Sequence, residues 1–244
     1  MTAIRTTNLT KKYKEKIAVN TLNLTIGQGE LYALLGVNGA GKTTTIKMLS
    51  CMLSPTSGDA VLLGDSIVSK PYAVKEKINI SPQETAVARN LSVKENIEMI
   101  AGIYGNDKKT AQDKTVAMMN TFGLAEAAGN RANTLSGGMQ RRLSIAMALI
   151  SNPKILFLDE PTLGLDVLAR RELWTAIKQL KGKITIVLTT HYMEEAEALS
   201  DRIGIMSNGE LKAVGTVREL IAQTDAKSFE DAFVALAAET GDAK

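Results

Sequence analysis

Residues 31–43, LYALLGVNGAGKT, decide the fold of this chain of 244 residues. LYALL is a run of apolar residues, which is typical of a strand buried on both faces of a sheet. GKTTTIKMLS (41–50) carries its apolar residues at helical spacing. The turn between them fits the pattern G-x-x-x-x-G-K followed by Ser or Thr, and such a turn between a buried strand and a helix is a phosphate-binding loop.

Each position of this loop has a chemical role. Gly36, Gly39 and Gly41 have no Cβ, so their backbone N–H groups can approach phosphate oxygens closely. Lys42 neutralises the β- and γ-phosphates, and the Thr43 hydroxyl is a ligand for Mg²⁺. The loop therefore predicts a nucleoside triphosphate bound with Mg²⁺. The predicted contacts in this segment are Gly36, Asn38, Gly39, Ala40, Gly41, Lys42, Thr43 and Thr44.

Two further apolar runs have the pattern of central strands. KILFL (154–158) and KITIVLTT (183–190) are predicted to be parallel strands buried on both faces. Each is followed by a stretch with helical spacing, RRELWTAIKQL (170–180) after the first and YMEEAEALS (192–200) after the second. This alternation predicts an α/β fold of the P-loop NTPase type with a mainly parallel central sheet.

Two segments depart from the alternation of strands and helices. The first 30 residues have the short, turn-bounded pattern of antiparallel strands, which predicts an N-terminal antiparallel β layer. Between Pro82 and Pro153 the strand pattern is lost and helical stretches replace it, which predicts an inserted helical subdomain. The predicted parts are an ATP-binding core with its β layer (1–83 and 154–222), a helical subdomain (84–153) and a short helical C-terminal extension (223–244).

Composition and charge argue against several classes of protein. The hydrophobic and charged fractions, 45% and 23%, are those of a globular protein rather than a disordered or fibrous one. A net charge of +3 with scattered Lys and Arg predicts no nucleic-acid partner. The single cysteine, Cys51, is predicted to be a buried apolar residue, and a reducing cytoplasmic setting fits it. We find neither a signal peptide nor an apolar run near 18 residues. If the protein acts at a membrane, we therefore expect another polypeptide to hold it there.

ILFLDE (155–160) places two carboxylates directly after a buried strand. Open α/β sheets bind ligands at the carboxyl ends of their strands, so Asp159 and Glu160 should lie on the same edge as the phosphate loop. Because successive strand residues point in opposite directions, the two acids can serve different atoms. We predict that Asp159 belongs to the metal shell and that Glu160 is the general base. His191 follows the strand at 183–190 on this edge and is predicted to sense the γ-phosphate; a solvated acid and a structural histidine are the alternatives.

NTLSGGMQRRLS (133–144) has a second helix start that suits an anion. Small residues precede a helix predicted from Met139 onward, so unpaired N–H donors and the helix dipole converge there. One chain thus carries two helix starts ready for phosphate, and these residues alone do not explain why.

The chain resembles the ATP-binding cassette of ABC transporters in four motifs that occur in the same order: GVNGAGKT, LSGGM (135–139), ILFLDE and His191. The resemblance extends from Tyr13 to about Leu220. It implies ATP and Mg²⁺ as cofactors and ATP hydrolysis as the reaction. It also implies a head-to-tail dimer with itself or a related cassette, in which each ATP lies between the phosphate loop of one subunit and the signature helix of the other.

The resemblance assigns roles to further residues. Ser136, Gly137 and Gly138 match the signature residues that hold the γ-phosphate of the partner's nucleotide, which accounts for the second helix start. The other matches are Tyr13, which resembles the aromatic residue stacked on adenine, Gln83, which resembles the Q-loop glutamine at magnesium and water, and Asp166, which resembles the D-loop aspartate at the dimer interface. Local packing for Tyr13 and simple solvation for Gln83 are the alternatives.

Two positions depart from the common pattern of the family. Met139 stands where the signature usually has Gln, so a polar contact by that side chain is in doubt. Val167 stands where many relatives have Pro, which leaves the loop after Asp166 less rigid.

Two classes of function remain open after the resemblance. The favoured one is the ATP-hydrolysing subunit of a membrane transporter, held at the inner face of the cell membrane by a separate permease. The alternative is an ABC-type ATPase that clamps nucleic acid or acts on ribosomes. Within transporters, DEPTLGLD (159–166) and FEDAFVAL (229–236) look most like cassettes of the daunorubicin- and sodium-exporter group, which favours export. No segment indicates the cargo.

Overall fold

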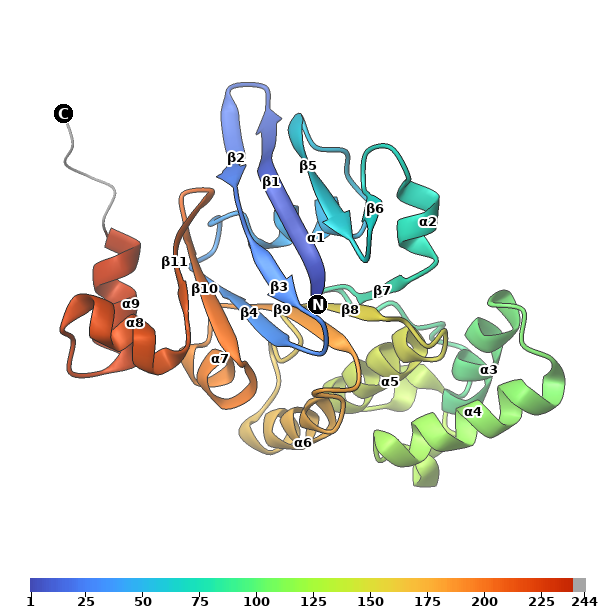
Figure 1. Ribbon diagram of the computed structural model, residues 1–244. Coiled ribbons are helices and arrows are strands. Elements are labelled where there is room, and N and C mark those ends of the chain that lie inside the picture. The colour runs from blue at the N-terminus through green and yellow to red at the C-terminus, as the bar shows by residue number, and fades with distance from the viewer. Residues whose placement is uncertain (239–244) are drawn as a thin grey trace.

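The computed structural model describes residues 1–238, and its centre is a six-stranded sheet (Figure 1). Neighbouring strands pair in parallel except for β10 and β11, which are antiparallel, so the predicted mainly parallel sheet is confirmed. In order across the sheet, the strands are β11 (Glu210–Gly215), β10 (Arg202–Ser207), β4 (Leu31–Leu35), β9 (Thr185–Thr190), β8 (Ile155–Asp159) and β7 (Ile78–Ser81).

A second, antiparallel sheet forms the predicted N-terminal β layer. Its long strand β1 is central, and Ile4 on this strand lies opposite Ile26 on one side and Leu62 on the other. All three side chains are buried, so the register is set by apolar residues. The strands are β1 (Thr2–Tyr13), β2 (Lys16–Leu22), β3 (Thr25–Gly27), β5 (Ser57–Leu62) and β6 (Asp65–Ser66).

Two apolar cores lie on opposite faces of the central sheet. Along β4, Leu31, Ala33 and Leu35 belong to one core, whereas Tyr32 and Leu34 belong to the other. This alternation is the two-residue period of a strand, with both faces covered. The first core lies under the helices and the second lies under the antiparallel sheet with α1 (Lys42–Leu49).

Helices fill the segment between Pro82 and Pro153, as predicted, and this segment projects to one side of the sheet (Figure 1). Ser92 and Glu95 form a capping box at the start of α3, and Asp107 caps α4, so each helix start is marked in the sequence. The elements are α3 (Val93–Ile103), α4 (Lys108–Thr121), the 3₁₀ turns η1 (Ala125–Ala127) and η2 (Ala132–Thr134), and α5 (Gly137–Leu149).

The remaining helices are α2 (Pro71–Lys75), α6 (Val167–Lys178), α7 (Met193–Leu199), α8 (Val217–Thr224) and α9 (Phe229–Ala238). Helix α8 crosses the predicted boundary at residue 222, and the last part of the predicted extension, 239–244, lies outside the described residues. Among the described helices, none has both the length and the apolar character needed to cross a bilayer.

The structure adds strands that the sequence analysis did not assign and corrects one residue. Strands β5, β6, β7, β10 and β11 were not predicted, because their short apolar runs are interrupted by polar or charged residues. The prediction that Cys51 is buried is wrong. Helix α1 ends at Leu49, and Cys51 lies half-buried in the following turn with φ 56°.

Candidate nucleotide-binding site

A pocket of about 550 Å³ opens at the carboxyl edge of the central sheet. Separate parts of the chain line it, because the parallel strands bring their ends to this one edge. The predicted residues that line it are Tyr13, the loop segment 38–44, Gln83, Glu160 and His191. The prediction that the phosphate loop, Glu160 and His191 lie at one edge of the sheet is therefore confirmed.

The phosphate loop leads from β4 into α1, as the pattern predicted. Gly41 is the N-cap residue, with φ 101°, and a Cβ there would lie 2.4 Å from the carbonyl oxygen of Ala18. Both the left-handed backbone and the close approach require glycine at this position. The helix start therefore keeps its N–H groups accessible to an anion.

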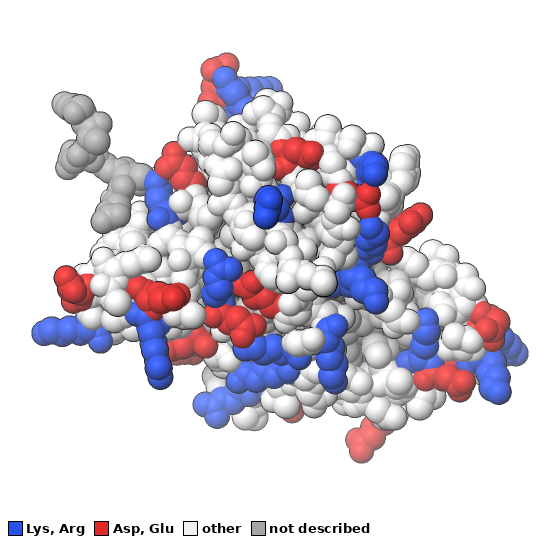
Figure 2. All heavy atoms as spheres, in the orientation of Figure 1, with Lys and Arg blue, Asp and Glu red and all other residues white. Residues whose placement is uncertain are grey.

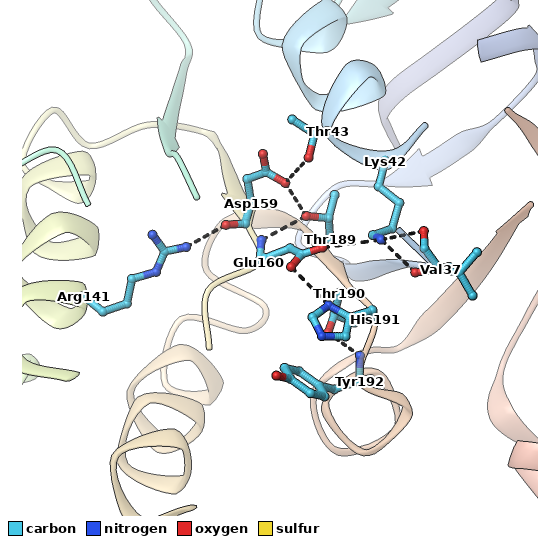
Figure 3. A network of polar contacts seen from close by, with 11 residues as sticks. Val37, Lys42, Thr43, Arg141, Asp159, Glu160, Thr189, Thr190, His191 and Tyr192 are labelled. Carbon is cyan, nitrogen blue, oxygen red and sulfur yellow. Dashed lines mark hydrogen bonds and ion pairs between the residues drawn. The ribbon is translucent and has the colours of Figure 1, made fainter. Parts of the chain in front are cut away.

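Lys42 is the cation of the loop and is only 4% exposed. Its Nζ donates to the carbonyl oxygens of Gly36 at 2.7 Å and Val37 at 3.2 Å, and it lies 3.4 Å from Glu160 Oε1 (Figure 3). Burial lowers the pKa of Lys42, and the Glu160 carboxylate opposes that shift. The protein thus holds a partly desolvated cation next to the place where phosphate charge would enter.

Asp159 ends strand β8 and faces the start of α1. Its Oδ1 accepts hydrogen bonds from Thr43 Oγ1 at 3.0 Å and from Thr189 Oγ1 at 2.6 Å. A hydroxyl and a carboxylate side by side are the hard oxygen donors that Mg²⁺ prefers, and Mg²⁺ takes few protein ligands beside water and phosphate oxygens. The residues fit Mg²⁺ held together with phosphate.

Glu160 follows the strand and adopts a left-handed backbone with φ 46°. Its N–H donates to Oγ1 of Thr189 at 3.0 Å, and its carboxylate lies between Lys42 and His191, with Oε2 3.1 Å from His191 Nδ1. The two acids do face different groups, but the predicted reason is wrong: Glu160 is not a strand residue, and the turn rather than strand alternation separates it from Asp159.

Tyr13 and Gln83 reach the pocket from other parts of the fold. Tyr13 ends β1, is 46% exposed and has Lys11 Nζ 5.3 Å from its ring centroid. An exposed aromatic face of this kind can stack on a nucleobase. Gln83 follows β7, which is the neighbour of β8 in the sheet, and so lies beside the acidic pair.

The signature residues do not line this pocket. Ser136 caps α5, because its Oγ accepts from the N–H of Met139 at 3.3 Å. A Cβ at Gly138 would lie 2.9 Å from Cβ of Ala169, so this glycine lets α5 pack closely on α6 within the same chain. Asp166 likewise caps α6 through the N–H groups of residues 168 and 169. Within one chain these residues thus have local roles, as helix caps and as a close helix contact.

Two residues of the site were not predicted. Thr189 bonds both Asp159 and the Glu160 N–H, and the threonine pair before His191 was its only signal. Arg141 donates to the main-chain carbonyl oxygens of the residues on both sides of Glu160. It was not predicted, because an arginine in a helix of mixed polar and apolar residues gives no signal of its own.

Comparison with known proteins decides the family. Residues 19–163 match the family model described as ABC transporter. The chain belongs to the ABC transporter family. Its fold is the P-loop NTPase fold of ABC cassettes, and the cassette is the domain of this family that binds and hydrolyses ATP.

Several curated proteins are similar to this cassette. The daunorubicin/doxorubicin resistance ATP-binding protein DrrA of Streptomyces peucetius is 39% identical over 219 residues, which are 89% of this chain and 66% of DrrA. The linearmycin resistance ATP-binding protein LnrL of Bacillus subtilis is 39% identical over 217 residues, covering 88% of this chain and 70% of LnrL. Human phospholipid-transporting ATPase ABCA3 is 41% identical over 203 residues, which cover 83% of this chain and 12% of that protein. The cassette therefore spans only part of some of these relatives.

Two solved structures have the same fold. An ATP-binding subunit of an ABC transporter superposes with a TM-score of 0.85 at 27% identity, over 96% of this chain and 99% of that one. A dimeric ATP-binding cassette in a post-hydrolysis state, bound to ADP and Pi, gives a TM-score of 0.79 at 26% identity, over 87% of this chain and 98% of that one. Dimeric, nucleotide-bound cassettes are thus among the structural neighbours.

Proposed function

We propose that this cassette hydrolyses ATP with Mg²⁺ between two subunits and so drives export through a separate membrane permease. The observation that carries the proposal is the division of the predicted site. Lys42, Glu160 and His191 line one pocket, and Asp159 accepts a hydrogen bond from Thr43 at its edge, whereas the anion-ready helix start at Ser136 lies outside it. A second cassette would bring its own helix start to this pocket, as the dimeric neighbour suggests.

The hydrolytic step follows from the contacts of Lys42. Incoming phosphate oxygens compete with Gly36, Val37 and Glu160 for the ammonium group, since a phosphate is a stronger acceptor than a neutral carbonyl. Glu160 loses this neighbour and accepts a proton from water, whose oxygen then attacks the γ-phosphorus as ADP leaves. His191 keeps the carboxylate oriented. Bound Mg²⁺, held by Thr43, Asp159 and Gln83, would supply charge neutralisation on the phosphates.

ATP binding would stabilise the closed dimer, and hydrolysis would release it. A ligand at a hundred times its Kd contributes on the order of 3 kcal/mol to the state that binds it, and two sites roughly double this. Cleavage removes the γ-phosphate that bridges Lys42 of one subunit and Ser136 of the other. This free energy is sufficient to shift a membrane partner between two states.

The permease is proposed to dock on the helical segment. A groove of about 160 Å³ lies between β7, α3 and α5, and residues such as Ile80, Ile100 and Met147 line it. Tyr104 also lines it and is 50% exposed, and the preceding residue, Ile103, is 72% exposed. An apolar groove of this size suits one apolar side chain on a helix from a multi-span partner. The partner would hold the cassette on the inner face of the cell membrane.

Two further parts of the proposal concern cargo and boundaries. DrrA and LnrL are named for resistance to drugs, which supports export rather than import, although the cargo is not identified by this chain. We propose that the chain divides into a core (1–83 and 154–222), a helical subdomain (84–153) and an extension (223–244).

Charges of both signs are interspersed on the face in Figure 2, which gives no support to a nucleic-acid clamp.

The proposal is tested with the purified protein and with solubilised membranes. ATPase activity per molecule should rise steeply with protein concentration, because the active species is a dimer. Activity that is independent of concentration, with a monomeric species throughout, contradicts the proposed dimer.

The docking of the permease is tested with a variant of the groove. Tyr104→Asp should abolish copurification with a multi-span membrane protein. Val234→Asp, at a 60% exposed site on α9, is the matched control and should not.

A further inference from the structure

Arg141 on α5 is a buried cation that donates hydrogen bonds to main-chain carbonyl oxygens close to the nucleotide pocket. Its exposed fraction is 4%. Nη2 donates to the carbonyl oxygen of Asp159 at 2.7 Å (Figure 3). Nε donates to the carbonyl oxygen of Pro161 at 2.9 Å. Nη1 donates to the carbonyl oxygens of Pro82 and, at 3.2 Å, of Gln83. Every nitrogen of the guanidinium therefore bonds main chain near the nucleotide pocket.

This arrangement needs an arginine. Burial lowers the pKa of Arg141 to about 10, and the nearby carboxylates of Asp159, Glu195 and Glu160 oppose the shift, so the group stays charged at neutral pH. Removing a cation from water is costly unless its donors are bonded, and here four carbonyl oxygens bond them. The planar fork reaches carbonyls on two separate segments, which the compact ammonium of lysine cannot do.

The bonded carbonyls belong to two turns that carry proposed site residues. Those of Asp159 and Pro161 bracket Glu160, whose φ of 46° is unfavourable for a residue with a Cβ and persists only where neighbouring contacts hold it. Those of Pro82 and Gln83 lie where β7 ends. One side chain thus ties the turn of Glu160 to the turn of Gln83.

The same side chain belongs to the signature helix, five positions after its cap at Ser136. A guanidinium that bonds both turns makes α5 move together with them. No atom of Arg141 lines the nucleotide pocket, so it acts through the turns and not on the ligand.

We propose that Arg141 is a positioning residue that holds the Glu160 turn and the Gln83 turn in register with the signature helix, and so sets the rate of hydrolysis without binding nucleotide. The inference rests on the proposed function, because it assumes that Glu160 and Gln83 serve hydrolysis.

Arg142 provides a matched control, since it is the next residue of the same helix. It bonds the carbonyl oxygen of Phe122 at 3.0 Å and lies 3.3 Å from the Glu172 carboxylate. It therefore makes contacts of the same kind, but to α4 and α6 and not to either turn.

The test compares Arg141→Lys and Arg141→Gln with Arg142→Lys in the full chain. For the Arg141 variants we expect kcat to fall roughly tenfold or more, while KM for ATP and the binding stoichiometry stay within about threefold, because the phosphate loop is untouched. Arg142→Lys should keep kcat. Hydrogen exchange, measured without nucleotide, should be at least roughly tenfold faster in segments 84–88 and 160–165 in the Arg141 variants alone.

Each outcome decides. Unchanged exchange in both segments, or equal effects of Arg141→Lys and Arg142→Lys, overturns the inference. Failure of both Arg141 variants to fold also overturns it, because Arg141 would then be a general stability residue. A parent protein without ATPase activity contradicts the proposed function instead, and the exchange experiment still decides whether Arg141 holds the two turns.

Discussion

The phosphate loop and the signature segment are both helix starts built from small residues, and the nucleotide pocket lies at the first and not at the second. At α1 the Nζ of the buried Lys42 lies 3.4 Å from the Glu160 carboxylate, and the Thr43 hydroxyl donates to Asp159 at 3.0 Å. At α5 the first turn has no charged residue, and the Ser136 hydroxyl is engaged in capping. The first start has a complete chemical environment, and the second has only N–H groups and a dipole.

This difference indicates that a helix start does not define a site by itself. The N–H donors favour an anion at both places, but only the α1 side supplies a cation, metal ligands and a base. The α5 side offers a surface that would complete another molecule's site. Loss of the two sides should therefore have different kinetic signatures, which the following variants separate.

Glu160→Gln should have the largest effect on turnover. The amide cannot take a proton from water, so kcat should fall by about 10²–10⁴ while ATP binding is kept. Phosphate release and nucleotide titration measure the two quantities. Glu194→Gln, whose side chain is 83% exposed on α7, is the control. ATPase activity close to that of the parent would refute the role of Glu160.

Ser136→Arg should leave the first pocket intact and damage turnover. A bulky side chain at the α5 start blocks an incoming phosphate, and loss of one such donor site costs about 10²–10³ in kcat. ATP affinity of the isolated subunit should stay within about threefold, because Ser136 does not line its pocket. Ser69→Arg, in the exposed turn before α2, serves as the control. A large loss of affinity in the isolated subunit would mean that Ser136 belongs to the pocket of its own chain.

Lys42→Ala should show the opposite signature. Charge-assisted bonds to phosphate contribute about 1.5–3 kcal/mol, so ATP affinity should fall roughly 10- to 100-fold. Lys47→Ala, at an exposed position of the same helix, should bind ATP as the parent does. Equal affinity of both variants in a calorimetric titration would count against the phosphate-loop assignment.

Glu195→Gln should have the smallest effect, on stability alone. Burial raises the pKa of Glu195 above its ordinary value of 4.5, so the folded protein binds this proton more tightly than the unfolded chain does. The free energy of unfolding of the parent therefore falls as the pH rises above 4.5 towards the raised pKa of Glu195. The glutamine in the variant does not titrate, so the variant does not lose this stability. The Tm of the variant minus that of the parent should increase by a few degrees from pH 4.5 to pH 8. A difference that does not change with pH would contradict this prediction.

The sequence predicted the parts of the molecule in which local pattern and tertiary role coincide. Adjacent residues specify the buried strand at Leu31–Leu35, the loop at Gly41 and Lys42, and the two acids at the end of β8. Edge strands such as β11 have mixed polar and apolar residues and were missed. The role of Arg141 could not be predicted, because its partners are carbonyl oxygens of segments far apart in the chain.

The backbone of Glu160 was a second point beyond prediction. Its φ of 46° depends on tertiary contacts such as the hydrogen bond from its N–H to Thr189, 29 positions away. The pairing of Lys42 with Glu160 likewise joins two segments that are far apart in the chain. It depends on the order of the strands in the sheet, and the alternation of strands and helices predicted a parallel sheet but not that order.

Mixing Lys42→Ala with Ser136→Arg tests the central claim most directly. With ATP kept near the Kd of the parent, each variant alone should be nearly inactive, because every site in its homodimer either binds ATP poorly or lacks a sound signature helix. In a mixed dimer one site combines the sound phosphate loop of the Ser136→Arg chain with the sound signature helix of the Lys42→Ala chain. Random pairing should therefore restore about a quarter of the parent's active sites. ATPase activity that stays at the level of the separate variants, although heterodimers are demonstrated by mass, would contradict a site completed by the second subunit.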